Sequence, residues 1–238
     1  MKSRRPHRAP RAAPPARVRA ASTQPPRHPL NGMPHTAGVF VPQGYEPGYP
    51  YPLIVWLPDP QAAAFDLGRT MARMSLRNFI AVEPAAATAD DGSGEAAWDA
   101  IAAVSDRLSI HADRIYLVGA GAGGTQAFRL ACRQPEAFAG VVSLGGGFPL
   151  DEGAFAGVAR LRRLPMLLCC RRDDDAAARS RTDRTLRLFH AAGATLALRI
   201  YPGCADLSKP VLADVNRWLM EDVCGPATPQ AAACGHEP

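Results

Sequence analysis

Short apolar runs alternate with segments of helical periodicity from residue 36 onward. The run Leu53–Leu57 is apolar without interruption, which is typical of a strand buried on both faces. Between such runs, apolar residues recur at the spacing of an amphipathic helix. Strands are predicted at 39–41, 53–57, 79–82, 114–118, 141–144, 166–170 and 196–201.

Helices are predicted over 95–109, over about 124–134, from about 180 to 193, and from 208 onward. Pro135 ends the second helix because proline cannot supply the next backbone donor. Ser180 and Asp183 form a predicted capping box for the third helix, and Gly193 closes it. Ser208 is predicted to cap the last helix. This alternation indicates an α/β fold, in which a mainly parallel sheet is covered by helices on both faces and binds ligands at the carboxyl ends of its strands.

The net charge of +5 is unevenly distributed along the 238 residues. Residues 1–30 hold eight Lys/Arg, seven Pro and no acid, so the rest of the chain carries a net charge of −3. A segment with so few large apolar side chains cannot bury enough surface to offset the entropy of ordering. We therefore expect residues 1–34 to be a disordered basic tail rich in Pro, Arg and Ala. Residues 35–222 are the expected folded domain, and residues 223–238 are an expected flexible C-terminal tail.

The sequence predicts neither a membrane span nor a secretory signal. No apolar run approaches the roughly 18 residues of a membrane-spanning helix, and no apolar segment follows the basic residues near the N-terminus. We expect a cytoplasmic protein. An organelle-targeting leader and an electrostatic arm for nucleic acid are alternative interpretations of the tail. The acidic charge of the domain makes nucleic acid the less favoured partner.

A glycine cluster, residues 119–124, joins the predicted strand 114–118 to the helix that follows. Gly119, Gly121 and Gly124 fit the G-x-G-x-x-G spacing of a dinucleotide-binding turn. That motif belongs to the first strand–helix unit, with an acid about 20 residues further on. Here three predicted strands come first, and Glu136 falls in a loop. The alternative is a nucleophile elbow, the sharp strand-to-helix turn that exposes a catalytic residue above a parallel sheet.

Several further segments agree in order and spacing with a known superfamily. They are Val41–Tyr45, Tyr51–Val55, Asp113–Gly119, Gly123–Gly124, Gly145–Gly147, Tyr201–Gly203 and Leu212–Val215. On these segments, roughly residues 37–222 resemble the α/β-hydrolase superfamily. The similarity is to its small esterases of the phospholipase/carboxylesterase and polyhydroxybutyrate-depolymerase-like kind. It implies a three-layer α/β-hydrolase fold and the hydrolysis of carboxylic esters by a Ser-His-Asp triad.

The resemblance also shows that the triad motifs are degenerate in this chain. Gly121 stands at the serine position of the G-x-S-x-G elbow, and Ala205 stands at the histidine position after the last strand. The acid position is kept at Asp173 or its neighbour Asp174. No catalytic triad is therefore expected to be intact.

The oxyanion hole is altered as well. Pro58 and Asp59 replace a His-Gly pair that shapes the hole in the family. The backbone N–H of Ala122 and the helix N-terminus near Gly124 should still point at the old oxyanion position, because backbone donors survive substitution. We expect the cleft at Pro58, Asp59 and Ala122 to bind a small anionic or carbonyl ligand. The nearby carboxylates should keep that binding weak.

No histidine is expected to replace the missing base. The histidines are His7, His28, His35, His111, His190 and His236. His111 enters a strand from its amino end, and His190 is expected to be a structural histidine inside a helix beside Phe189. A hydroxyl nucleophile without a base in hydrogen-bond reach is not activated.

A cysteine nucleophile is the remaining alternative. Cys170 ends one predicted strand and Cys204 follows the next, and a thiolate at either residue could be favoured by the nearby Arg171 and Arg172. Two small buried apolar residues are the simpler interpretation, because unpaired cysteine is usually buried. No Cys/His spacing of the zinc-binding kind occurs, so neither a metal nor a cofactor is expected.

Together these patterns predict an esterase-like α/β-hydrolase-fold protein that is catalytically inactive and has a binding or scaffold role. The alternative is an active carboxylesterase or phospholipase-type serine hydrolase homologue with a misassigned or non-standard site. An ester assay separates the two hypotheses.

Overall fold

A computed structural model describes residues 36–62, 65–85, 94–149, 158–203 and 207–223. Within them, one seven-stranded sheet has the order β1-β3-β2-β4-β5-β6-β7. The strands are β1 (Thr36–Phe40), β2 (Tyr51–Leu57), β3 (Ile80–Pro84), β4 (Ile110–Ala120), β5 (Gly140–Leu144), β6 (Met166–Arg171) and β7 (Leu196–Tyr201). Only the pairing of β1 with β3 is antiparallel. The predicted mainly parallel α/β sheet is confirmed. The predicted tails lie outside the described residues, except for Val223, which ends a short helical turn.

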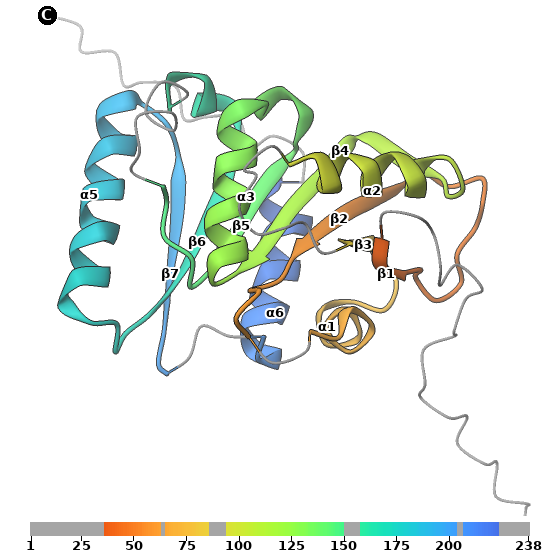
Figure 1. Ribbon diagram of the computed structural model, residues 1–238, viewed down its shortest axis with the longest axis horizontal. Coiled ribbons are helices and arrows are strands. Elements are labelled where there is room, and N and C mark those ends of the chain that lie inside the picture. Colours follow the sequence, from red (N-terminus) through yellow and green to blue (C-terminus); the bar gives the residue numbers. More distant parts are fainter. Residues whose placement is uncertain (1–35, 63–64, 86–93, 150–157, 204–206, 224–238) are drawn as a thin grey trace, which may run out of the picture.

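Helices cover the sheet on both faces (Figure 1). Helices α2, α3 and α5 pack on one face, and α1 and α6 pack on the other. Their bounds are α1 (Leu67–Met74), α2 (Glu95–Ser105), α3 (Ala122–Arg133), α5 (Ala176–Ala192) and α6 (Lys209–Arg217), and short helical turns are η1 (Pro135–Ala137), η2 (Val158–Arg163) and η3 (Trp218–Val223). None of the helices in the described residues is long and apolar enough to cross a membrane.

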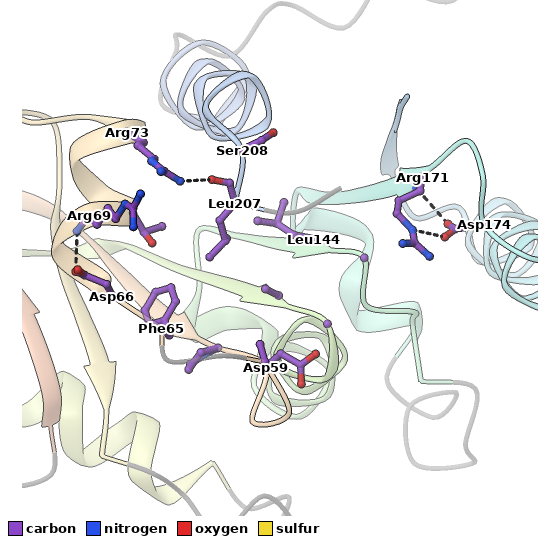
Figure 2. Close-up of a pocket in the computed structure, with 16 residues that line it drawn as sticks. Asp59, Phe65, Asp66, Arg69, Arg73, Leu144, Arg171, Asp174, Leu207 and Ser208 are labelled. Atoms are coloured by element: carbon purple, nitrogen blue, oxygen red, sulfur yellow. Dashed lines mark hydrogen bonds and ion pairs between the residues drawn. The ribbon is translucent and has the colours of Figure 1, made fainter. Parts of the chain in front are cut away.

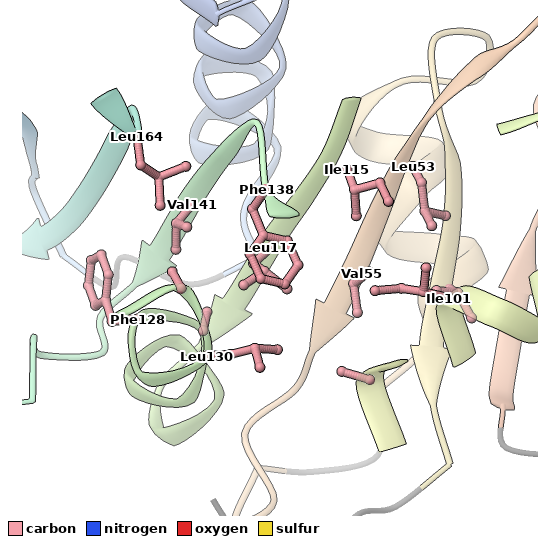
Figure 3. Close-up of a cluster of buried hydrophobic side chains, with 14 of the residues drawn as sticks. Leu53, Val55, Ile101, Ile115, Leu117, Phe128, Leu130, Phe138, Val141 and Leu164 are labelled. Atoms are coloured by element: carbon pink, nitrogen blue, oxygen red, sulfur yellow. The ribbon is translucent and has the colours of Figure 1, made fainter. Parts of the chain in front are cut away.

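The core is divided between the two faces by the alternation of each strand. Leu53 and Val55 of β2 point to the α2/α3 face, which Figure 3 shows with Phe128 and Leu130 of α3. Ile54 and Trp56 point to the opposite face. Burying a large apolar side chain contributes about 1.5–3 kcal/mol, so a strand that is apolar on both sides stabilises both layers.

Two details of the helix predictions are wrong. Helix α5 begins at Ala176, and Asp175, whose Oδ1 accepts the Ala178 N–H at 2.7 Å, is its N-cap. The predicted capping residues Ser180 and Asp183 are instead exposed within the helix. Helix α2 ends at Ser105, four residues before the predicted end at 109.

One helix was not predicted at all. Helix α1 has only eight residues, LGRTMARM, and a glycine and two arginines are among them, so few of its positions are apolar. Its start is fixed by Asp66, whose Oδ1 accepts the Arg69 N–H at 2.8 Å. Leu67, Met71 and Met74 are its buried apolar face. This missed helix forms one wall of the site.

Candidate functional site

The turn from β4 into α3 has the geometry of a nucleophile elbow. Gly121, between the two elements, has φ 51° and ψ −125°, a backbone conformation that glycine adopts without the clash of a Cβ. Its N–H donates to the Leu144 carbonyl at 2.9 Å, which ties the turn to β5. Its carbonyl accepts the Gly124 N–H at 3.0 Å at the start of the helix. The residue at position 121 is thereby presented at the carboxyl end of the sheet.

The glycines on either side of Gly121 are required by close packing. A Cβ built on Gly119 would lie 2.6 Å from the backbone nitrogen of Gly124, and one built on Gly123 would lie 2.6 Å from the Pro58 carbonyl oxygen. Real Cβ atoms do not approach backbone atoms so closely. The G-x-G-x-G spacing around Gly121 is therefore a structural requirement of this turn.

The Asp59 carboxylate covers Gly121. A Cβ built on Gly121 would lie 2.8 Å from Asp59 Cγ and would collide with Asp59 Oδ2. The other carboxylate oxygen, Oδ1, accepts the Gln61 N–H at 3.0 Å, so the side chain is fixed by its own loop. The space where a serine side chain would begin is occupied by a carboxylate from the end of β2.

A cleft of about 870 Å³ opens beside this turn, at the carboxyl ends of the central strands. Figure 2 shows its walls: α1 on one side, the Arg171–Asp174 loop on the other, and Asp59 near the start of α3. Its lining residues are Pro58, Asp59, Ala62, Phe65, Asp66, Arg69, Thr70, Arg73, Ala120, Gly121, Leu144, Gly145, Arg171, Asp174, Leu207 and Ser208. The volume is typical of a small-molecule site.

Of the two candidate acids, Asp174 faces the cleft and Asp173 is exposed outside it. Asp174 is already engaged, because its Oδ1 lies 3.0 Å from Arg171 Nε and its Oδ2 accepts the Arg171 N–H at 3.1 Å. Both of its carboxylate oxygens therefore already contact Arg171. Position 205, where Ala205 stands for the base, lies outside the described residues, as does Cys204.

The two histidines in the described residues both lie away from the cleft. His111 is in the first part of β4, and its Nδ1 accepts the Asp113 N–H at 3.2 Å. His190 is exposed near the end of α5, whereas its neighbour Phe189 is buried. His190 lies inside a helix, as predicted, and its side chain faces solvent.

The cysteines of β6 are poor thiolates. Burial raises the pKa of Cys169 to about 12. Burial also raises the pKa of Cys170, whose Sγ lies 3.7 Å from Thr182 Oγ1. The suggestion that Arg171 and Arg172 favour a thiolate is therefore wrong for Cys170, because burial raises the pKa of this thiol. The described residues contain no group of three or more His, Cys, Asp or Glu able to hold a metal ion.

Sequence reasoning missed the cationic wall of the cleft. Arg69 and Arg73 of α1 line it, together with Phe65 just before the helix. A usable signal was present, because Asp66 is a good N-cap and Leu67, Met71 and Met74 recur at helical spacing.

Comparisons with known proteins agree with this fold. No protein-family model and no curated protein matches the sequence. Solved structures do match. A thermostable esterase has a TM-score of 0.62 at 19% identity, covering 77% of this chain and 57% of that one. Esterase 2 of Thermogutta terrifontis, phosphoramylated by tabun, has a TM-score of 0.61 at 14% identity, and the match covers 80% of this chain and 90% of that one.

The S-formylglutathione hydrolase of Staphylococcus aureus has a TM-score of 0.54 at 15% identity, with 71% of this chain and 81% of that chain covered. The chain spans little more than half the length of the thermostable esterase. At these identities the similarity is one of fold. The chain therefore has the three-layer α/β-hydrolase fold of these esterases, as its sequence segments implied.

Proposed function

We propose that this esterase-like protein does not hydrolyse esters and that its cleft binds a small ligand. The observation that carries the proposal is the contact between Asp59 and Gly121. At the elbow position there is no nucleophilic side chain, and the space above it holds a carboxylate fixed by the Gln61 N–H. Hydrolysis by an acyl-enzyme route needs a nucleophile with a base in reach.

The surroundings support the same conclusion. Pro58 and Pro60 flank Asp59 and have no backbone N–H, so this loop offers few donors for an oxyanion. The retained acid, Asp174, is paired with Arg171 and not with a histidine. A cleft of about 870 Å³ nevertheless persists beside the elbow. Binding without turnover is the role that such a cleft supports.

The test is hydrolysis of p-nitrophenyl acetate and p-nitrophenyl butyrate by the purified full-length chain, measured against a buffer blank. Leftover backbone donors can accelerate hydrolysis by roughly 10³-fold over water, so a slow residual rate is compatible with the proposal. Turnover on the order of 1 per second, which is ordinary for an enzyme, would overturn it.

A second function, hydrolysis through a non-standard site, is favoured by the same carboxylate. Asp59 could act as a base for water at the elbow, since it lies beside the position where a reacting carbonyl would be held. The variant Asp59→Asn decides between the two functions. An activity of the wild type that disappears in this variant supports hydrolysis, whereas equal background rates support the binding role.

A further inference from the structure

Arg69 and Arg73 make one wall of the cleft cationic. They lie four residues apart in α1, so they project from the same side of the helix one turn apart. Both line the cleft, as Figure 2 shows. The described residues give neither side chain an ion pair. Two guanidinium groups are therefore presented together to the same space.

The third arginine of the cleft, Arg171, is in a different state. Its Nε lies 3.0 Å from Asp174 Oδ1, and both residues belong to the loop that forms the opposite wall of the cleft. Among the described residues, Arg73 makes one hydrogen bond, from its Nη1 to the Leu207 carbonyl at 3.3 Å, so these residues engage few of its five N–H donors. Cationic donors that remain available to a ligand are thus concentrated on α1.

Arg69 does not stabilise α1, whereas Arg73 lies in the last turn, where the helix dipole favours a cation. Arg69 lies in the first turn, where the helix dipole disfavours a cation, and like charges at i and i+4 repel each other. Asp66 offsets part of this as the N-cap, through its bond to the Arg69 N–H. An anion bound between the two guanidinium groups would relieve both unfavourable terms.

The carboxylates of the cleft limit which anion fits. Asp59 occupies the elbow and Asp66 begins α1, so both repel negative charge that extends beyond the arginines. A dianion such as a phosphate monoester would be opposed more strongly than a carboxylate. Because Asp59 occupies the elbow, we expect the anion to bind at α1. A vestigial oxyanion hole alone would instead place it at the Ala122 N–H.

The rest of the lining is apolar. Phe65, Leu144 and Leu207 lie between the arginines and the elbow (Figure 2). Phe65 is stacked on buried Trp56, with ring centroids 5.5 Å apart and an interplanar angle of 12°. This stack gives the cleft a firm aromatic surface against which an alkyl or aryl group can be buried.

We propose that the ligand is an amphiphilic monocarboxylate, an inference that rests on the proposed binding function. Its carboxylate is held by Arg69 and Arg73, and its apolar body packs against Phe65, Leu144 and Leu207. Guanidinium groups suit this role because their forked N–H donors match the two oxygens of a carboxylate.

The test is calorimetric titration of the full-length chain at pH 7 with octanoate, octanamide and octyl phosphate. We expect octanoate to bind at least about 10-fold more tightly than the uncharged amide, as loss of a charged hydrogen-bonding partner implies. Octyl phosphate should not bind more tightly than octanoate. Arg69→Gln and Arg73→Gln should each weaken the binding of octanoate by about 10-fold and leave the binding of octanamide unchanged. Arg107→Gln, an exposed arginine beyond α2 on the other face of the sheet, is the matched control.

The outcomes separate this inference from the proposed function. Equal binding of octanoate and octanamide, unaffected by either α1 variant, overturns the anion proposal while the binding role stands. Tighter binding of octyl phosphate overturns the preference for a monoanion. Chemical-shift changes that cluster at residues 121–124 and not at 69–73 overturn the placement. Ester turnover in the assay above overturns the proposed function, whatever the octanoate titration gives.

Discussion

The carboxylate of Asp59 lies over the α-carbon of Gly121, and no side chain fits at position 121 while Asp59 keeps its conformation. The two residues come from different strands, because Asp59 follows β2 and Gly121 follows β4. The parallel pairing of Leu57 with Gly119 brings these two strand ends together. Substitutions at the two positions should therefore be energetically coupled.

Gly121→Ser should destabilise the fold by about 1–3 kcal/mol, because serine must adopt the strained φ of 51° and also displace Asp59. In an Asp59→Ala background the same change should cost less, with a coupling energy of about 0.5–3 kcal/mol. Urea denaturation of the four proteins in this cycle measures the coupling.

Gly147→Ser is the control for that cycle, since a Cβ at Gly147 would meet nothing within 4 Å. Additive effects of the Gly121 and Asp59 changes would show that the two residues do not share this space. Gly121→Ser should also restore no ester hydrolysis by itself, because a hydroxyl without a base is barely nucleophilic. Activity in that single variant would contradict our assignment of the elbow.

Gly123→Ala should destabilise the protein by about 1–3 kcal/mol or more, because the new methyl group would press against the carbonyl oxygens of Leu57 and Pro58. Backbone atoms cannot move aside as a flexible side chain can. Thermal melts compare it with Gly147→Ala, which should change stability little. Equal melting temperatures for the two variants would mean that β2 and α3 are not as close as described.

Cys169 and Cys170 should resist alkylation in the native protein. With a pKa of about 12, Cys169 is ionised to only roughly 10⁻⁴ at pH 8, and burial also raises the pKa of Cys170. Iodoacetamide labelling followed by peptide mass spectrometry should find both modified far more slowly in the native chain than in urea. Rapid labelling of Cys170 in the native chain would contradict this prediction and support the hypothesis of a cysteine nucleophile.

Glu83→Gln should stabilise the protein at neutral pH. Burial, reinforced by the negative charge of Asp66, raises the pKa of Glu83, so the folded state disfavours its carboxylate. Stability associated with Glu83 is therefore present below the ordinary glutamate pKa of about 4.3 and is lost as the pH rises through the higher folded value. The advantage of the variant should be small at pH 4 and larger at pH 7.

Urea denaturation at both pH values measures this difference, with the exposed Glu46→Gln as the matched control. A Glu83→Gln benefit that is the same at both pH values would have to come from packing and not from the charge.

The strands were predictable because their signal is local. β2 and β4 are buried on both faces, so their sequences are apolar at nearly every position from Leu53 to Trp56 and from Ile115 to Val118. The glycine spacing at the elbow was equally visible, since Gly119 and Gly123 are required by contacts within the turn and with its neighbouring strand.

The chemistry of the cleft was less predictable, because it depends on contacts between distant segments. Nothing local to Asp59 says that its carboxylate covers Gly121, 62 residues further along the chain. The arginine wall was missed together with α1, because this helix has only eight residues, too few to repeat an apolar stripe over several turns.

The position of β2 inside the sheet has a consequence for which segments around the cleft open first. β2 is hydrogen-bonded to β3 and β4, and Leu53 to Trp56 are 0% exposed, so its amides should exchange with deuterium only through global unfolding. Helix α1, with eight residues and one buried face, should exchange through smaller openings. A ligand held by α1 would then slow exchange in that helix first and leave the amides of β2 unchanged.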